Sequence, residues 1–178
     1  MRSMNMAMDK DIERKDGSMM LQYQQIGIIH TEFRDKKDAP IQGVFAKDAK
    51  GKVELYPEYV AGLKDIEGFS HIILIYHFHL ADGYSLISKP FLEDEQHGIF
   101  SLRHFKRPNP IGLSVVKLER VNGNILEISE VDILDGTPLL DIKPLIPRFD
   151  NRSDAKSGWL SNPHLDLVRG ESGKHRSE

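Results

Sequence analysis

Residues 69–79 read Phe-Ser-His-Ile-Ile-Leu-Ile-Tyr-His-Phe-His and carry the clearest strand signal in the chain. Side chains alternate between the two faces of a strand, so the large apolar residues at even positions share one face. The opposite face carries His71, Ile73, Ile75, His77 and His79. Since both faces are largely apolar, the stretch predicts a central strand whose histidine end meets a cavity or solvent.

The segments around this strand also carry strand and turn signals. Residues 22–33 form a β-rich opening segment. Further along, Leu113–Val121 and Asn124–Val131 meet at Asn122-Gly123, a strong two-residue hairpin signal. In the second of these segments apolar and polar residues alternate, which is typical of a sheet that is wet on one side.

Two other segments predict local structure. Val44–Lys47 and Lys52–Leu55 flank an Asp-Ala-Lys-Gly turn and predict a hairpin. Pro57–Leu63 predicts a short helix, because proline is tolerated in the first turn. Helical periodicity is scarce elsewhere and no βαβ alternation occurs. The sequence therefore predicts an all-β, single-domain closed or strongly curved β-barrel with short helical insertions.

Composition limits the class of protein. The chain has 178 residues and is 39% hydrophobic, which suits one domain, and its longest apolar run is too short to span a bilayer. With no cysteine, disulfides and thiolate metal sites are excluded, and a cytoplasmic location is favoured. The net charge of -3 argues against a generally cationic nucleic-acid binder, so nucleic acid would need a local basic patch.

The two ends of the chain differ from its middle. All six methionines lie in the first twenty residues among charged side chains, which predicts a poorly ordered leader over residues 1–20. The polar, glycine-containing end predicts a loose tail over residues 161–178. We therefore expect the barrel domain to occupy residues 21–160.

Two loops carry possible chemistry. Residues 105–112 hold two prolines around an asparagine and overlap the densest cationic segment, which contains Arg103, His104, Lys106 and Arg107. They predict either a surface turn or a stiff arm that presents guanidinium groups to a carboxylate or phosphate. Asp135-Gly136-Thr137-Pro138 is either a tight turn or a loop whose glycine lets a ligand approach the backbone.

Several familiar sites are absent from the sequence. No two glycines are separated by a single residue, so a dinucleotide-type turn is excluded, and no phosphate-binding P-loop occurs. His77 and His79 share a strand face, but nothing fixes the third ligand that a metal site needs, so we expect no metal. No Ser-His-Asp pattern supports a hydrolase.

Four segments together resemble the TsaA-like (TrmO-type) family. They are Ile26–Thr31, Gly68–Ile72, Arg103 with Arg107–Ser114, and Asp135–Pro138 with Asp141–Pro144. The resemblance runs from Gln25 to Trp159 and implies a β-barrel that binds S-adenosylmethionine without a Rossmann sheet, usually as a homodimer. It also implies N6-methylation of threonylcarbamoyl-adenosine in the anticodon loop of tRNA, with no DNA or membrane partner.

The resemblance also implies a set of cofactor contacts, carried over by position. They are Pro40, Ile41, Gln42, His79, Leu80, Arg103, Gly112, Leu113, Asp132, Leu134, Asp135, Gly136, Thr137 and Pro138. Arg103 is expected to hold the methionine carboxylate, and Asp135 or nearby carbonyls to face ribose hydroxyls, adenine or the sulfonium. No catalytic residue is assigned, because His77, His79 and several aspartates remain alternatives for a general base.

One segment departs from the family. Where the family type often reads Ala-Thr-Arg-Ser-Pro, this chain has Ser101-Leu102-Arg103-His104-Phe105. We also expect the extra C-terminal domain of longer bacterial members to be absent. Two alternatives therefore stay open: a methyltransferase on the same barrel with a small-molecule or protein acceptor, and a non-enzymatic cofactor- or metal-binding protein.

Overall fold

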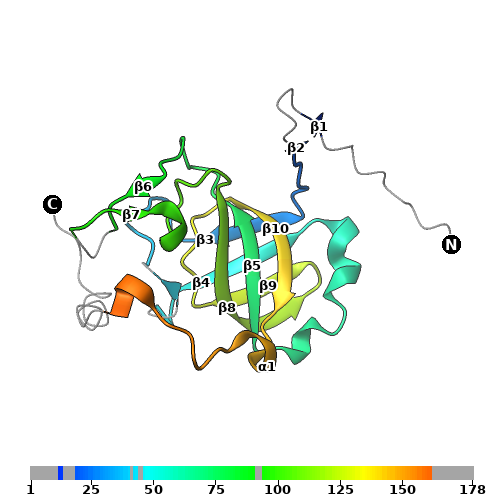
Figure 1. The fold of residues 1–178 in the computed structure, drawn as a ribbon. Helices are drawn as coiled ribbons and strands as arrows, with labels where there is room; N and C mark the ends of the chain where they lie inside the picture. Colours follow the sequence, from blue (N-terminus) through cyan, green and yellow to red (C-terminus); the bar gives the residue numbers. More distant parts are fainter. Residues whose placement is uncertain (1–11, 14–18, 41, 44–45, 91–93, 162–178) are drawn as a thin grey trace.

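The protein is described here by a computed structural model that covers residues 12–13, 19–40, 42–43, 46–90 and 94–161. Its main strands are β3 (Gly27–Thr31), β4 (Lys50–Leu55), β5 (His71–His77), β8 (Ile111–Asn122), β9 (Ile125–Ser129) and β10 (Thr137–Pro144). All neighbouring strands are antiparallel, in the order β10-β3-β4-β9-β8-β5, and β5 pairs with β10 to close a barrel (Figure 1). The expected all-β barrel is confirmed.

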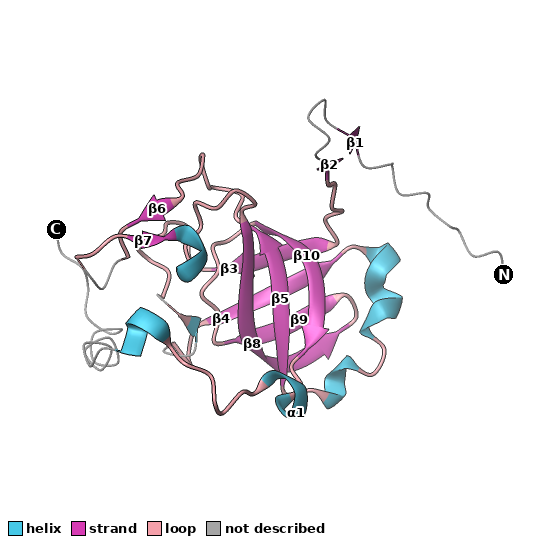
Figure 2. Ribbon diagram, in the orientation of Figure 1, coloured by secondary structure: helices cyan, strands magenta, loops and turns pink. Residues whose placement is uncertain are grey.

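Short elements surround the barrel. They are β1 (Ile12–Glu13), β2 (Met19–Met20), η2 (Pro57–Leu63), η3 (Ile66–Gly68), β6 (Ile87–Ser88), β7 (His97–Gly98), η4 (Ile99–Ser101), α1 (Pro147–Asp150) and η5 (Gly158–Ser161). Figure 2 shows that the helical turns lie at the outside of the barrel. None of the helices in the described part of the chain is long and apolar enough to cross a membrane.

The core fills the inside of the barrel. Along β5, residues 72, 74 and 76 are buried and the odd positions are half-buried, so the alternation expected for this strand is confirmed. The other strands contribute large side chains with almost no exposure, among them Ile29, Val53, Val116, Leu126, Ile128 and Leu139. Since β5 lies between β8 and β10, its central position is also as predicted.

The expected hairpin at Asn122-Gly123 forms between β8 and β9, with φ of 62° at the glycine. Pro57–Leu63 forms the expected short helix, as a 3-10 helix. The hairpin expected from Val44–Lys47 and Lys52–Leu55 is wrong. A strand has only two edges, and those of β4 are taken by β3 and β9. Val44 lies outside the described residues, and Lys47 belongs to a turn.

A small flap extends from one end of the barrel. It consists of β6 paired with β7 and continues into η4. Later in the chain, Trp159 stacks on His97 with ring centroids 4.4 Å apart and donates its indole N–H to the carbonyl of Ser101 at 3.0 Å. These contacts fasten the residues around η5 to the flap.

The regions expected as leader and tail lie largely outside the described residues. In the first, β1 pairs with β2. Of the second, only Ser161, the last residue of η5, is described.

Candidate ligand-binding site

A cavity of about 220 Å³ lies where β5 ends and β10 begins. It is lined by Lys36, Ala39, Pro40, Tyr76, Phe78, His79, Leu80, Ala81, Phe105, Asp132, Ile133, Leu134 and Thr137. These residues come from four separate segments: the loop after β3, the end of β5, the loop before β8, and the loop that leads from β9 into β10. The wall is mostly apolar and aromatic, with a few polar groups, as is usual for small-ligand sites.

A chain of three hydrogen bonds runs along the inner wall of this cavity. The Tyr76 hydroxyl lies 3.0 Å from Ser114 Oγ, and Ser114 Oγ donates to Asp132 Oδ1 at 2.7 Å. Because the one hydroxyl proton of Ser114 goes to Asp132, Tyr76 must be the donor to Ser114. The second oxygen of Asp132 accepts the backbone N–H of Gly43 at 3.2 Å. Each direction in the chain is therefore fixed.

Burial shifts the ionisation of both ends of this chain. It raises the pKa of Tyr76 to about 12, although the hydrogen bond with Ser114 opposes the shift. Burial also raises the pKa of Asp132, while the hydrogen bonds from Ser114 and Gly43 and the positive charge of Arg103 act in the opposite direction. The cavity thus holds a carboxyl group whose charge is incompletely compensated, a good partner for a cationic ligand.

Gly112 makes this arrangement possible. It lies opposite Tyr76 in the β5–β8 ladder, and a Cβ atom placed on it would lie 2.1 Å from Cε2 of the tyrosine ring. The ring therefore occupies the space that any other residue at 112 would need. Ser114 lies two residues after Gly112 on β8, faces the same barrel interior and accepts the hydrogen bond of the Tyr76 hydroxyl. Within the Ile-Gly-Leu-Ser signature, Gly112 thus leaves room for the Tyr76 ring and Ser114 accepts its hydroxyl hydrogen bond.

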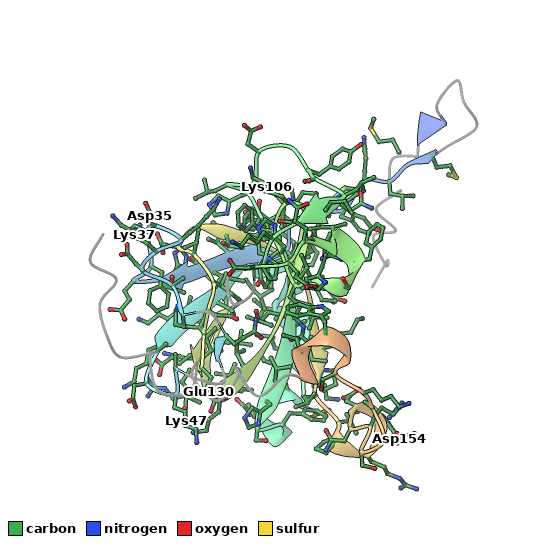
Figure 3. All side chains as sticks on the ribbon, turned by 60° about the vertical axis from the view of Figure 1, so that its left-hand side comes forward. Asp35, Lys37, Lys47, Lys106, Glu130 and Asp154 are labelled. Carbon is green, nitrogen blue, oxygen red and sulfur yellow. The ribbon has the colours of Figure 1, made fainter. Side chains whose placement is uncertain are left out.

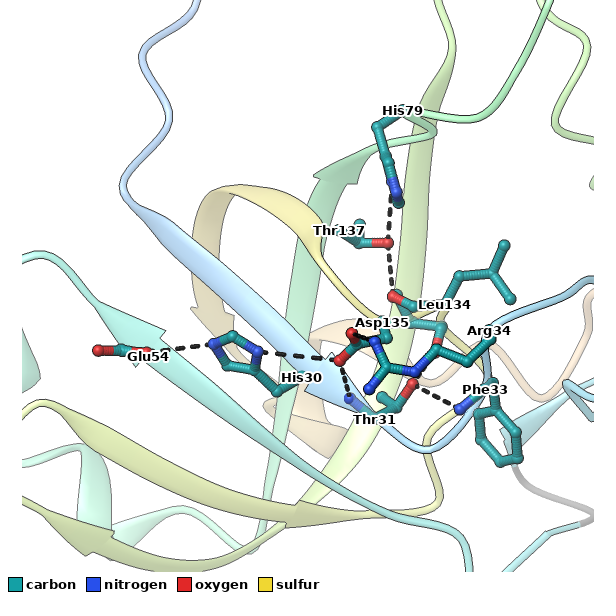
Figure 4. A network of polar contacts seen from close by, with 10 residues as sticks. His30, Thr31, Phe33, Arg34, Glu54, His79, Leu134, Asp135 and Thr137 are labelled. Carbon is teal, nitrogen blue, oxygen red and sulfur yellow. Dashed lines mark hydrogen bonds and ion pairs between the residues drawn. The ribbon is translucent and has the colours of Figure 1, made fainter.

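His79 lies two residues beyond the end of β5, beside Thr137 (Figure 4). Thr137 Oγ1 donates to the carbonyl of Leu134 at 2.7 Å and lies 3.3 Å from His79 Nδ1. Since the threonine proton is already used, Nδ1 of His79 must be the donor, and Nε2 keeps its lone pair. Burial, with a smaller contribution from His77, lowers the pKa of His79. A neutral imidazole with an accepting Nε2 therefore lines the cavity.

Asp135 is occupied by protein groups. One oxygen accepts the backbone N–H of Thr31 at 3.0 Å, and the other pairs with the guanidinium of Arg34. His30 Nδ1 lies 3.8 Å from the same carboxylate, and its Nε2 lies 3.1 Å from Glu54 (Figure 4). This network ties the loop before β10 to β3, the strand beside it in the barrel.

The two arginines of the cationic segment before β8 have different contacts. Arg107 Nη1 donates to the carbonyls of Ile99 at 3.1 Å and Leu102 at 2.6 Å, so this guanidinium holds η4. Arg103 is exposed, and its Nη1 lies 3.4 Å from Oε1 of Gln42. Of the two readings of this segment, Arg107 fits the structural one, and Arg103 is the guanidinium that remains accessible.

The expected cofactor contacts fall into three groups. Pro40, His79, Leu80, Asp132, Leu134 and Thr137 line the cavity together. Gln42, Arg103, Gly112, Asp135, Gly136 and Pro138 lie around it without lining it. Leu113 points outward from the barrel and is 55% exposed, and Ile41 lies outside the described residues.

Other lining residues were not predicted. Lys36, Tyr76, Phe78 and Phe105 belong to the cavity, and Ser114 supports it. The sequence places Tyr76 and Phe78 on the same strand face as the buried residues of β5. This shared face is the signal that could have identified them as lining residues. Lys36 carries no such pattern in the sequence. In the described residues, no group of three His, Asp or Glu side chains is arranged to hold a metal ion.

A closed antiparallel barrel with this pocket at one end defines a small-ligand-binding barrel rather than a Rossmann-type protein. A profile of the tRNA-methyltransferase O N-terminal domain matches residues 28–151. The chain therefore belongs to the TrmO family, and the resemblance drawn from its signatures is confirmed.

Individual relatives agree with this assignment. A protein of Pyrococcus abyssi named a probable S-adenosyl-L-methionine-binding protein is 58% identical over 80% of this chain and 77% of its own length. The Escherichia coli tRNA (adenine(37)-N6)-methyltransferase is 32% identical over 79% of this chain and 64% of its own. The crystal structure of TrmO from Pseudomonas aeruginosa superposes with a TM-score of 0.68 at 38% identity, covering 79% of this chain and 63% of that one.

Proposed function

We propose that this protein is an S-adenosylmethionine-dependent methyltransferase that methylates N6 of threonylcarbamoyl-adenosine in the anticodon loop of tRNA. One observation carries the proposal. Six cofactor contacts that the family resemblance implies by position, drawn from three separate stretches of sequence, line one cavity. Membership of the TrmO family and the names of its relatives support the same cofactor and acceptor.

The cavity suits the chemistry of this cofactor, which supplies a methyl group on a positively charged sulfur. The buried carboxyl of Asp132 offers a negative partner for that charge, and the aromatic wall from Tyr76 to Phe105 offers apolar surface. Arg103 is the accessible guanidinium near Asp132 and suits the methionine carboxylate. Transfer then depends mainly on holding donor and acceptor in line, so the fixed wall contributes by positioning.

The amine that accepts the methyl group must lose a proton. His79 is suited to receive it, because its Nδ1 donates to Thr137 and its Nε2 is left as an acceptor beside the cavity. Burial lowers the pKa of this imidazole, which keeps Nε2 unprotonated. His77 does not line the cavity, which favours His79 among the two histidines.

We also propose that the protein forms a homodimer in the cytoplasm. The outer face of the barrel supports the dimer, because Ile111, Leu113 and Val115 of β8 are 38, 55 and 39% exposed. Across the ladder, Leu113 and Val115 are paired with Ile75 and Ile73 of β5, so two adjacent strands present one apolar surface. A tRNA substrate supports the cytoplasmic location.

The dimer is tested by light scattering on the full chain. Leu113→Glu places a charge in the middle of this apolar face and is expected to give monomers. Phe149→Glu is the matched control, because Phe149 is 60% exposed on α1 and lies outside the face. A monomeric wild type, or a Leu113→Glu protein that stays dimeric, contradicts the proposed interface.

The cofactor is tested by calorimetric titration with S-adenosylmethionine. The wild type is expected to bind, and Arg103→Ala to bind on the order of tenfold more weakly, the loss of one charge-assisted hydrogen bond. Arg148→Ala serves as control, because this exposed arginine belongs to α1 and not to the cavity. No binding by the wild type would contradict the assignment of the cofactor.

The acceptor needs a separate test. Mass spectrometry of tRNA nucleosides from a deletion strain is expected to show loss of the methylated threonylcarbamoyl-adenosine and its return on complementation. An unchanged nucleoside, combined with tight cofactor binding, would instead favour a small-molecule or protein acceptor. The altered Ser101–Phe105 segment beside the cavity is the feature that keeps this second candidate in view.

A further inference from the structure

Two loops far apart in the sequence meet at the edge of the cavity. Lys36, in the loop after β3, places its Nζ 3.7 Å from the centre of the Phe105 ring. His104 stacks on the same ring, with centroids 4.3 Å apart. Lys36 and Phe105 both line the cavity, so this junction belongs to its rim. Two of its residues, His104 and Phe105, belong to the segment in which the sequence departs from its family.

The rim carries positive charge that the protein does not neutralise. In the described part of the chain, no carboxylate lies within 4.0 Å of the ammonium groups of Lys36 or Lys106. The neighbouring cations are engaged, since Arg34 pairs with Asp135 and Arg107 binds two carbonyls. Lys36 and Lys106 are therefore left for a ligand at this rim, in addition to Arg103, which is assigned to the cofactor carboxylate.

His104, whose ring senses the charges of both lysines, adds a third donor. The backbone N–H of Lys106 donates to Nδ1 of His104 at 3.1 Å, so the ring proton lies on Nε2. Burial, followed by the positive charges of Lys106, Lys36 and Arg107, lowers the pKa of His104. The three groups thus offer hydrogen-bond donors alone, and a bound anion relieves the repulsion between the cations.

We propose that Lys36, His104 and Lys106 bind a backbone phosphate of the RNA acceptor, beside the nucleotide whose base enters the cavity. This inference rests on the proposed function, because it names where that acceptor is held. A phosphate offers several oxygens to donors that come from two loops. Since Lys36 also lines the cavity, a phosphate at the rim belongs to the nucleotide being methylated or to its neighbour, and that nucleotide leaves its stack to reach the site.

The test measures RNA binding and cofactor binding in the same full-length proteins. A fluorescent anticodon stem-loop RNA is titrated at several salt concentrations with the wild type and with Lys36→Gln/Lys106→Gln. We expect the double variant to bind on the order of tenfold more weakly at physiological salt and its salt slope to fall by about 1, because one phosphate contact is lost. The single variant Lys106→Gln changes a side chain that does not line the cavity, so its affinity for S-adenosylmethionine should stay within about twofold of the wild type.

The control is Lys47→Gln/Lys64→Gln, which removes the same charge from two other exposed positions. Figure 3 places Lys47 at the opposite end of the molecule from Lys106. A stem-loop with neutral methylphosphonates at the loop phosphates should bind the wild type as weakly as the rim variant binds ordinary RNA.

Three results would overturn the proposal. They are equal RNA affinity and salt slope in the rim and control variants, a lack of RNA binding by the wild type, and a loss of cofactor affinity in Lys106→Gln that shows the anion to be the cofactor carboxylate. Failure of the proposed function looks different, because a protein that binds no S-adenosylmethionine can still bind RNA through these lysines.

Discussion

On the inner wall of the barrel, Tyr76, Ser114 and Asp132 form a chain of hydrogen bonds in which each direction is fixed. At the rim, Lys36 and Lys106 face one imidazole with no described carboxylate at ion-pair distance. In the wall, Ser114 belongs to the family signature, whereas in the rim His104 belongs to the segment that departs from the family. A fixed wall suits a small ligand of constant shape, and exposed cations suit a larger acceptor that arrives from outside.

The sharpest test of the fixed wall is Gly112→Ala. The new methyl group would overlap the Tyr76 ring, so overpacking is expected to lower the free energy of unfolding by about 3 kcal/mol and to weaken S-adenosylmethionine binding. Urea denaturation measures the loss. Gly98→Ala is the control, because an added Cβ there meets no atom within 4 Å. Equal stability of the two variants would mean that Tyr76 is not held against β8.

A double-mutant cycle examines the hydrogen bonds of the same wall. Ser114→Ala leaves the Tyr76 hydroxyl buried without its acceptor, and we expect a loss of about 2 kcal/mol in urea denaturation. Adding Tyr76→Phe removes the orphaned hydroxyl, so the double variant should lose less than the sum of the single changes. Ser129→Ala is the control, since this buried serine donates only to the exposed Glu119. Strictly additive losses of stability in Ser114→Ala and Tyr76→Phe would contradict the hydrogen bond between these two side chains.

A smaller change separates the two neighbouring cations before β8. Arg107→Lys loses the Nη1 group that donates to the carbonyls of Ile99 and Leu102, and is expected to lower the free energy of unfolding by about 1 kcal/mol. Lys106→Gln should stay within about 0.5 kcal/mol of the wild type, because its side chain supports no part of the fold. If Lys106→Gln proves the more damaging of the two in urea denaturation, the assignment of Arg107 to the fold and of Lys106 to a ligand is wrong.

The smallest effect appears as a trend with pH. Burial raises the pKa of Asp132 above its ordinary value of 3.8, so as the pH rises the unfolded chain ionises this group before the folded protein does. Wild-type stability is therefore expected to fall relative to Asp132→Asn between these two pKa values and to level off above the higher one. Urea denaturation from pH 3 upward measures the difference.

Asp154→Asn is the control for this trend, because its carboxylate is exposed and far from the cavity wall (Figure 3). A constant difference between wild type and Asp132→Asn, or one that grows in favour of the wild type, would contradict a buried, incompletely compensated carboxyl.

Local patterns predicted much of the fold. The alternation in residues 69–79 and the turn at Asn122-Gly123 identified β5 and the β8–β9 hairpin, because both signals depend on near neighbours in the chain. The pairing of β3 with β10 and of β4 with β9 depends on residues far apart in sequence, which no local pattern records. The wrong hairpin at residues 44–55 has this cause, since its turn residues fit but both edges of β4 were already used.

The site was predicted unevenly for a related reason. The resemblance to the family, carried over by position, implied Asp132, Thr137 and His79, and these residues line the cavity together. Tyr76 was seen only as a strand residue, because its role arises from the absence of a side chain at Gly112 on the neighbouring strand. Lys36 reaches the cavity through the packing of one loop on Phe105, a contact that the order of residues along the chain does not encode.

The cavity draws its lining from segments that meet only when β10 closes the barrel between β3 and β5. No single segment contains enough of the site to hold a ligand, so the unfolded chain should have negligible affinity for one. Any ligand that fills the cavity consequently raises the melting temperature, by an amount set by mass action. At a hundred times its dissociation constant it adds about 2.7 kcal/mol to the free energy of unfolding, which makes thermal melting a direct screen for what this protein binds.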